Sequence, residues 1–205
     1  MEISEADAYK GLYAAFKSVV EYRHNKLLPD IETKSHILQA ARWLINPYGT
    51  FGLLLCGLCG NGKTTLATAI GWLIRYVTKK EYGFNNHIDV PLYTTKEVYE
   101  LCCASEKSKE NKSQYTKLFK ESIIILDDLG EEPKEVMVYG MIHTPVLDLI
   151  CKRYSEQRMT IITTNLDTDQ LKEKYGMRIY DRFREMLTPI IFENDSYRRP
   201  KKNGA

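Results

Sequence analysis

Short apolar runs alternate along this chain with longer stretches in which apolar residues recur every three or four positions. A run without polar interruptions predicts a strand that is buried on both faces of a sheet, and the helical spacing predicts amphipathic helices. Strands interleaved with helices are typical of a parallel sheet covered on both sides. We therefore expect an α/β fold with strands at residues 51–56, 89–95, 123–128, 160–165 and 190–193.

The predicted helices begin near the N-terminus, where Ser4 and Asp7 form the pattern of a capping box. Leu12, Phe16 and Val19 then recur at helical spacing. Further helices are expected at residues 37–44, 64–77, 96–105, 136–155, 168–175 and 178–187. Residues 106–122 form a polar, lysine-rich stretch between a predicted helix and a predicted strand.

Composition and charge narrow the class of protein. A length of 205 residues and a hydrophobic fraction of 43% suit one domain with a substantial core. The formal net charge of +2 is too small to identify a partner by itself. No apolar run approaches the roughly 18 residues of a membrane span, and the acidic N-terminus lacks the apolar segment of a signal peptide. Five cysteines, an odd number, argue against a disulfide framework. We therefore expect a cytoplasmic protein without a membrane partner.

The stretch GLCGNGKTTL, from Gly57 to Leu66, follows a predicted strand and opens a predicted helix. Its pattern Gly-x-x-x-x-Gly-Lys-Thr is that of a phosphate-binding loop. Glycines allow backbone N–H groups to approach an anion closely, and the helix N-terminus adds a partial positive charge. Lys63 is expected to reach the terminal phosphates of a nucleotide, and Thr64 to offer its hydroxyl to Mg²⁺. The predicted nucleotide-binding residues of the loop are Gly57, Gly60, Asn61, Gly62, Lys63, Thr64 and Thr65.

The apolar run IIILDD, residues 123–128, ends in two acids. Asp127 is expected to bind Mg²⁺ through water, and Asp128 to orient and deprotonate an attacking water. A kinase needs no such second acid, because its acceptor is a substrate hydroxyl. The alternative for Asp128 is that it caps the turn that follows it.

The run TIITTN, residues 160–165, places polar groups at the carboxyl end of another predicted strand. In open α/β sheets ligands bind at this edge. Asn165 is therefore expected to hold the attacking water opposite Asp128. The alternative is that Asn165 caps the next helix, which Asp167 or Thr168 can do instead.

Five segments together resemble the AAA+ ATPases of the DnaC/IstB type, which are bacterial helicase loaders and relatives that assist transposases. In chain order they are GLCGNGKTTLATAI, IIILDDLG, ICKRYSEQRMTIITTN, RIYDRFREM and SYRR. The resemblance implies a P-loop NTPase with three α/β/α layers, a five-stranded parallel core sheet and no large C-terminal lid. It also implies ATP and Mg²⁺ as ligands. The corresponding divisions are an N-terminal helical extension (1–34), an AAA+ ATPase core (35–200) and a basic, polar tail (201–205).

The resemblance gives Arg182, in the segment RIYDRFRE, the role of an arginine finger. Such a residue reaches into the ATP site of a neighbouring subunit, so this role implies a homo-oligomer with an intersubunit ATP site. Arg178 and Arg184 are nearby alternatives. A solvated Arg182 that pairs with Asp181 or Glu185 is the structural alternative.

A second arginine role follows from the segment SYRR near the C-terminus. Arg198 matches the sensor arginine that touches the nucleotide in the family, and Arg199 is its competitor. The alternative is a basic tail, which the letters RRPKK also suggest.

The family further implies a surface for single-stranded DNA between the second strand and the acidic strand. Lysines with interspersed aromatic side chains suit contacts to phosphates and bases. Glu106, Glu110 and Glu121 dilute this charge, so a solvated helix and loop is the alternative. The residues concerned are Lys107, Lys109, Lys112, Tyr115, Lys117, Phe119 and Lys120.

The resemblance thus implies a weak ATPase that acts in DNA replication as a helicase loader and binds single-stranded DNA and a replicative helicase. An ATPase that assists a transposase shares this chemistry and differs in its partner. A small-molecule kinase and a non-enzymatic nucleotide-binding scaffold are further alternatives, whereas a GTPase is disfavoured because no N-K-x-D segment occurs. About 35 residues precede the core, too few for a separate helicase-binding domain, which leaves the partner open.

Overall fold

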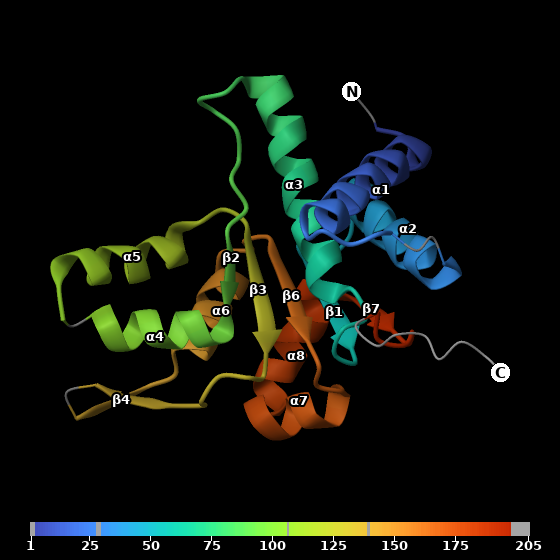
Figure 1. Ribbon diagram of the computed structural model, residues 1–205. Helices are drawn as coiled ribbons and strands as arrows, with labels where there is room; N and C mark the ends of the chain where they lie inside the picture. The colour runs from blue at the N-terminus through green and yellow to red at the C-terminus, as the bar shows by residue number, and fades with distance from the viewer. Residues whose placement is uncertain (1–2, 28–29, 106, 139, 198–205) are drawn as a thin grey trace.

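The computed structural model describes residues 3–27, 30–105, 107–138 and 140–197. Five parallel strands form one sheet in the order β2-β3-β6-β1-β7, so the carboxyl ends of all five strands lie at the same edge (Figure 1). The strands are β1 (Gly52–Gly57), β2 (Leu92–Thr94), β3 (Ile124–Leu129), β6 (Thr160–Thr164) and β7 (Leu187–Phe192). The prediction of a five-stranded parallel sheet is confirmed.

Helices cover both faces of this sheet and give three α/β/α layers. Leu53 and Leu55 pack in one apolar cluster with α1–α3, whereas Leu54 packs in a second cluster with helices of the other face. One strand thus buries successive side chains in opposite directions, as its uninterrupted apolar run predicts. The first layer holds α1 (Glu5–Tyr22), α2 (Ile31–Ile45) and α3 (Lys63–Tyr82). The remaining helices are α4 (Thr95–Ser105), α5 (Lys109–Lys120), α6 (Pro145–Ser155), α7 (Thr168–Tyr175) and α8 (Met177–Met186).

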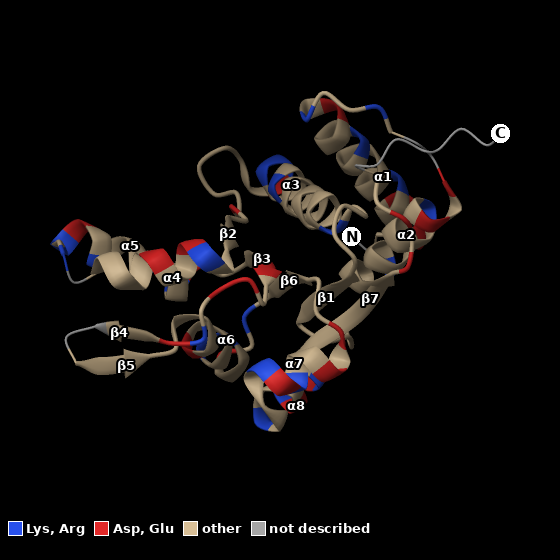
Figure 2. Ribbon diagram, turned by 60° about the horizontal axis from the view of Figure 1, so that its bottom comes forward, with Lys and Arg blue, Asp and Glu red and all other residues tan. Residues whose placement is uncertain are grey.

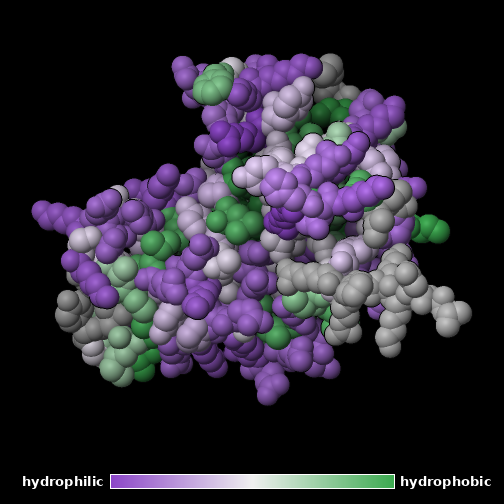
Figure 3. Space-filling view, viewed as in Figure 1, coloured by the Kyte–Doolittle hydropathy of each residue, from purple (hydrophilic) through white to green (hydrophobic). Residues whose placement is uncertain are grey.

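The helix predicted over residues 136–155 is wrong in its first half. Strands β4 (Val136–Val138) and β5 (Met141–His143) form an antiparallel hairpin there, and α6 begins only at Pro145. Gly140 has a φ of 77°, which a tight turn requires and glycine tolerates. Proline at the first helical position is favourable, so Pro145 marks the start of α6. The hairpin leaves apolar side chains exposed at the lower left of Figure 3, with Met137 72% exposed.

Other helices and strands begin or end a few residues away from their predicted bounds. The second strand is shorter than the predicted 89–95, and α3 continues five residues beyond the predicted 64–77, to Tyr82. The lysine-rich stretch contains α5, which packs beside α4 at the outer edge of the sheet, next to β2 (Figure 1). No helix in the described part of the chain is both long and apolar enough to cross a membrane.

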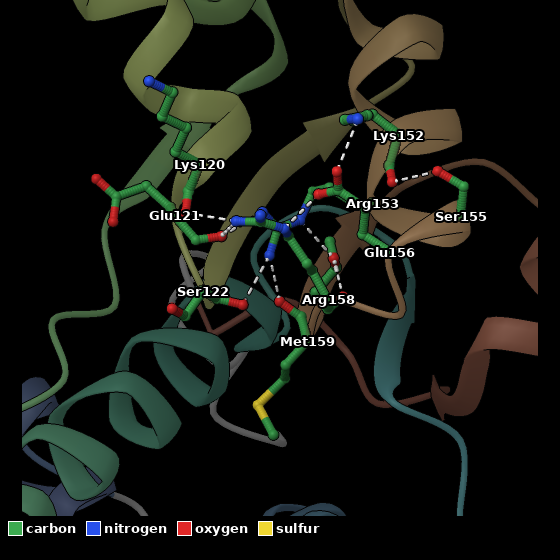
Figure 4. A network of polar contacts seen from close by, with 10 residues as sticks. Lys120, Glu121, Ser122, Lys152, Arg153, Ser155, Glu156, Arg158 and Met159 are labelled. Atoms are coloured by element: carbon green, nitrogen blue, oxygen red, sulfur yellow. Dashed lines mark hydrogen bonds and ion pairs between the residues drawn. The ribbon is translucent and has the colours of Figure 1, made fainter.

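A fully buried arginine joins α6 to the sheet at the edge opposite the carboxyl ends of the strands (Figure 4). Arg153 donates hydrogen bonds to the Thr160 hydroxyl (2.7 Å) and to the carbonyl oxygens of Glu121 (2.8 Å), Ser122 (3.2 Å) and Met159 (2.6 Å). Burial, and secondarily the neighbouring Arg158 cation, lowers the pKa of Arg153 to about 10, so it stays charged at neutral pH. The arginine therefore fixes the segment between α5 and β3.

Replacing Arg153 with methionine should unfold the protein at a clearly lower urea concentration. The change removes the Arg153 hydrogen bonds to the Glu121, Ser122 and Met159 carbonyls, although Glu121 keeps Arg158 and Met159 keeps the Ile124 N–H as donors. Hydrogen bonds to a charged group contribute about 1.5–3 kcal/mol each. We expect a loss of about 3 kcal/mol or more in the free energy of unfolding, measured by circular dichroism. Lys152→Met is the matched control, because its ion pair with Glu156 is on the surface and is worth about 1 kcal/mol at most. Equal midpoints for the two variants would contradict this assignment.

Candidate functional site

A cavity of about 950 Å³ opens at the edge where the strands end. Strands β3, β6 and β1 are neighbours in the sheet, so the segments that follow them meet at this edge. The loop after β1, the acids at the end of β3 and Asn165 after β6 all line the cavity. The structure therefore brings together the three elements that the sequence predicted separately.

The loop after β1 has a backbone that only glycine adopts easily. Gly57 has a φ of 143°, and a Cβ atom there would lie 2.3 Å from the Phe192 carbonyl oxygen. Gly62 is the N-cap of α3 in the left-handed conformation, with no side-chain cap hydrogen bond. The first N–H groups of α3 are thus not capped by a side chain, an arrangement that binds anions.

Lys63 lies at the centre of the loop and is 5% exposed. Its ammonium group donates hydrogen bonds to the carbonyl oxygens of Gly57 (2.7 Å) and Leu58 (2.7 Å). It also donates to the side-chain oxygens of Asn61 (3.2 Å) and Asn165 (2.9 Å). Burial lowers the pKa of Lys63, and the nearby Asp128 and Asp127 charges oppose this shift. Lys63 therefore connects the loop to the end of β6.

Thr64 and Asp127 converge on one point of the cavity wall. The Asp127 carboxylate accepts hydrogen bonds from the hydroxyls of Thr64 (2.9 Å) and Thr163 (2.6 Å). Mg²⁺ is bound in nucleotide sites by one or two such protein oxygens together with phosphate oxygens. The donor set therefore fits a magnesium ion. Thr163, which the sequence marked only as a polar strand end, also accepts the Asp128 N–H (2.9 Å) and so fixes both acids.

Asp128 and Asn165 lie in the same cavity, near Lys63. Asp128 has a φ of 56°, an unusual value for a residue other than glycine that is found at functional sites. The helix after Asn165 is capped by Asp167, whose side chain accepts from the N–H groups of Asp169 and Gln170. Capping therefore does not require Asn165, and both residues are positioned toward the cavity.

Residues after β7 hold the outer side of the loop. Asn61 donates to the Phe192 carbonyl (3.1 Å), and Asn194 donates to the Asn61 carbonyl (3.1 Å). The Tyr197 N–H donates to the Gly60 carbonyl (2.9 Å), and its hydroxyl contacts Thr33 and Asp30 near the start of α2. Sequence reasoning missed these contacts, because Asn194 belongs to no motif and the segment SYRR, which contains Tyr197, was interpreted through its arginines alone.

Comparison with known proteins gives a family. Residues 38–205 match the model of the IstB-like ATP binding proteins. The chain belongs to this family. It is of the DnaC/IstB type among AAA+ ATPases, and its P-loop NTPase fold has no large lid in the described residues. The comparison with curated proteins finds no match.

Solved structures with the same fold include replication proteins. The DnaC helicase loader has 22% sequence identity and a TM-score of 0.62, with 82% of this chain and 93% of DnaC covered. DnaI has 22% identity and a TM-score of 0.58, with 80% and 87% covered. The replication initiator DnaA, bound to AMPPCP and single-stranded DNA, has 16% identity and a TM-score of 0.54, with 80% of this chain and 46% of DnaA covered. At these identities the likeness concerns the fold.

Arg182 of this IstB-like chain does not line the cavity. It lies on α8, half-buried, where it donates to the Cys151 sulfur and stands over the Tyr154 ring of α6 with 5.3 Å to the ring centroid. Lys and Arg alternate with Asp and Glu along α7 and α8 (Figure 2), and both Arg178 and Arg184 are exposed. The predicted pairing of Arg182 with Asp181 or Glu185 does not occur among the described residues. Arg198 and Arg199 lie outside the described residues.

Proposed function

We propose that this IstB-like chain binds ATP with Mg²⁺, hydrolyses ATP to ADP and phosphate, and acts in DNA replication as a DnaC-like helicase loader. The observation that carries the ATPase proposal is the convergence of Lys63, Thr64, Asp127, Asp128 and Asn165 on one cavity. Lys63 and Thr64 begin α3 after the loop that follows β1, and the other three groups lie at the ends of β3 and β6, so their positions depend on the sheet. Family membership supports nucleotide use.

Each residue of the site is assigned a role in hydrolysis that suits its chemistry. Lys63 and the N–H groups of the loop bind the terminal phosphates. Thr64 and Asp127 would hold Mg²⁺, which when bound offsets the charge of the phosphate oxygens. Asp128 accepts a proton from the attacking water, and Asn165 orients that water from the neighbouring strand. Thr163 keeps the Asp127 carboxylate in place for this purpose.

Purified protein should release phosphate from ATP slowly, and Lys63→Ala should reduce this release to background. Asp128→Asn should bind ATP with nearly unchanged affinity and lose about 10²–10⁴-fold in turnover, because only general-base catalysis is removed. Phosphate release and nucleotide titration measure the two effects separately. Lys80→Ala, an exposed lysine on the same helix, is the control. Turnover in Lys63→Ala equal to that of wild type would refute the proposal.

Arg182 is proposed as the arginine finger supplied to a neighbouring subunit in a homo-oligomer. Its separation from the cavity of its own chain supports a role in another subunit. The guanidinium now stands over Tyr154, a contact that would have to be exchanged for one with phosphate oxygens.

Mixing two inactive variants tests this assignment. Arg182→Ala should lower turnover by about 10³-fold or more, as for other arginine fingers. A mixture of Arg182→Ala and Lys63→Ala subunits should recover part of the activity. In such a mixture the intact ATP site of an Arg182→Ala subunit can receive Arg182 from a neighbouring Lys63→Ala subunit. Arg182→Ala with full activity on its own would contradict the role. Loss of activity in Arg184→Ala in its place would assign the finger to that exposed alternative.

The lysines of α5 are proposed to bind single-stranded DNA. Lys109, Lys112, Lys117 and Lys120 surround a shallow hollow on one side of the helix. Tyr115 and Phe119 form a half-buried edge-to-face pair, with ring centroids 5.1 Å apart, so the proposal is argued from the exposed lysines. The lysines suit contacts to phosphates.

Lys112→Ala combined with Lys117→Ala should weaken binding of single-stranded DNA at all sequences alike. Each lost phosphate contact on a single strand lowers the slope of log K against log salt by about 0.7, so the double variant should lose about 1.4. Fluorescence anisotropy over a range of salt concentrations measures this slope. Lys10→Ala with Lys17→Ala on α1 is the charge-matched control. An unchanged slope would exclude α5 as the surface.

A replicative helicase is the partner we propose, since solved structures with the same fold include the DnaC helicase loader. A transposase is the alternative partner, because the family model is that of the IstB-like proteins. Affinity purification of the tagged chain from its source cells, with ATP present, should recover a hexameric helicase. Recovery of a transposase in its place would favour the role of a transposition helper.

A further inference from the structure

One wall of the candidate nucleotide cavity comes from outside the family match. The match begins at residue 38, whereas Phe16, Val20 and Leu27, in α1 and just after it, line the cavity. Helix α1 is held there by apolar packing against α3, in a cluster that includes Phe16 and Leu66. The residues of this wall therefore lie outside the segment that matches the family model.

The same wall carries a cation that approaches the phosphate-binding loop. Arg23 is the C-cap of α1, and its carbonyl accepts a hydrogen bond from the Asn25 side chain (3.0 Å). Its guanidinium donates to the hydroxyl of Thr65 (3.1 Å), the residue after the magnesium-site threonine. Arg23 is exposed and lines the cavity. Within the described ranges no acidic side chain forms an ion pair with it, so most of its N–H donors are available to a ligand.

The contacts of Thr64 and Thr65 relate the position of Arg23 to the parts of a nucleotide. Thr64 bonds to Asp127 at the metal end, and Thr65, one residue further along α3, bonds to Arg23. The apolar side chains Phe16 and Leu27 stand on the α1 wall with Arg23. A nucleotide presents terminal phosphates with a metal, then the phosphate nearest the sugar, then a flat base with apolar faces. A position one residue beyond the metal-site threonine, on a wall with apolar side chains, favours the phosphate nearest the sugar as the group that Thr65 and Arg23 face.

We propose that Arg23 is a direct ligand of the phosphate nearest the sugar in a bound nucleotide. This inference rests on the proposed nucleotide binding. A planar guanidinium forms charge-assisted, bidentate hydrogen bonds with phosphate, and Lys26 on the same wall adds a second positive charge. Because ADP and ATP share this phosphate, Arg23 stabilises both equally. It also makes α1 part of the binding site, so nucleotide occupancy is linked to the N-terminal helix.

Titration calorimetry with the full chain tests this role. Arg23→Gln should raise the Kd for ADP and for ATP by about tenfold each, a loss of about 1.4 kcal/mol, and leave their ratio unchanged. Arg23→Lys should recover part of the affinity, because it keeps the charge but not the bidentate geometry. Lys17→Gln removes the same charge elsewhere on α1 and should bind like wild type. The unfolding midpoint without nucleotide should be the same in all variants, since both side chains are exposed.

A Thr65→Val background separates direct contact from indirect positioning. The loss caused by Arg23→Gln should persist there if Arg23 touches phosphate, whereas its disappearance would overturn the proposal. A loss for ATP alone would also overturn it, because that would assign Arg23 to the terminal phosphate. If wild type binds both nucleotides, Lys63→Ala binds neither and Arg23→Gln matches wild type, only the Arg23 inference fails. Failure of wild type to bind either nucleotide would refute the proposed function itself.

Discussion

A buried ammonium group connects the parts of the candidate site. Lys63 is 5% exposed, and a cation so far from water is stable only among oxygen ligands. The carbonyls of Gly57 and Leu58 supply two of them, so the loop must fold back over its own lysine. Asn165 supplies another from the end of β6. The geometry of the loop therefore depends on β6 lying next to β1 in the sheet.

The outer side of the loop is held by hydrogen bonds that do not involve Lys63. They join Asn61 and Gly60 to Phe192, Asn194 and Tyr197, in and after β7. A phosphate oxygen would compete with Asn165 for the ammonium group, because a hydrogen bond between two charged groups is stronger than one to a neutral amide. The outer contacts use other atoms, so this exchange of acceptors does not require them to break. The arrangement thus allows Asn165 to change partner while the backbone of the loop stays fixed.

The sequence predicted those features of the fold whose signals are local. Uninterrupted apolar runs identified the strands, and the spacing from Gly57 to Thr64 identified the loop. The hairpin at 136–143 was missed because its apolar residues are also compatible with a helix, and the turn at Gly140 decides between the two. The contacts of Tyr197 were missed for another reason. They join segments at opposite ends of the chain, which no local pattern encodes.

Helix α5 shows why composition alone gave an incomplete account of the proposed DNA surface. Tyr115 and Phe119 are four residues apart, so they share one side of the helix, and Phe119 packs there against the apolar cluster of the sheet. The lysines occupy the remaining side, around Ser113 and Thr116.

The position of α5 is also set independently of the nucleotide loop. Arg153 and Arg158 bind the Glu121 carbonyl at its C-terminus, at the opposite edge of the sheet (Figure 4). Helix α1, by contrast, packs on α3, which begins at the loop itself. Of these two helices, α1 is therefore the one that a nucleotide bound at the loop would affect directly, whereas α5 would respond only through the sheet.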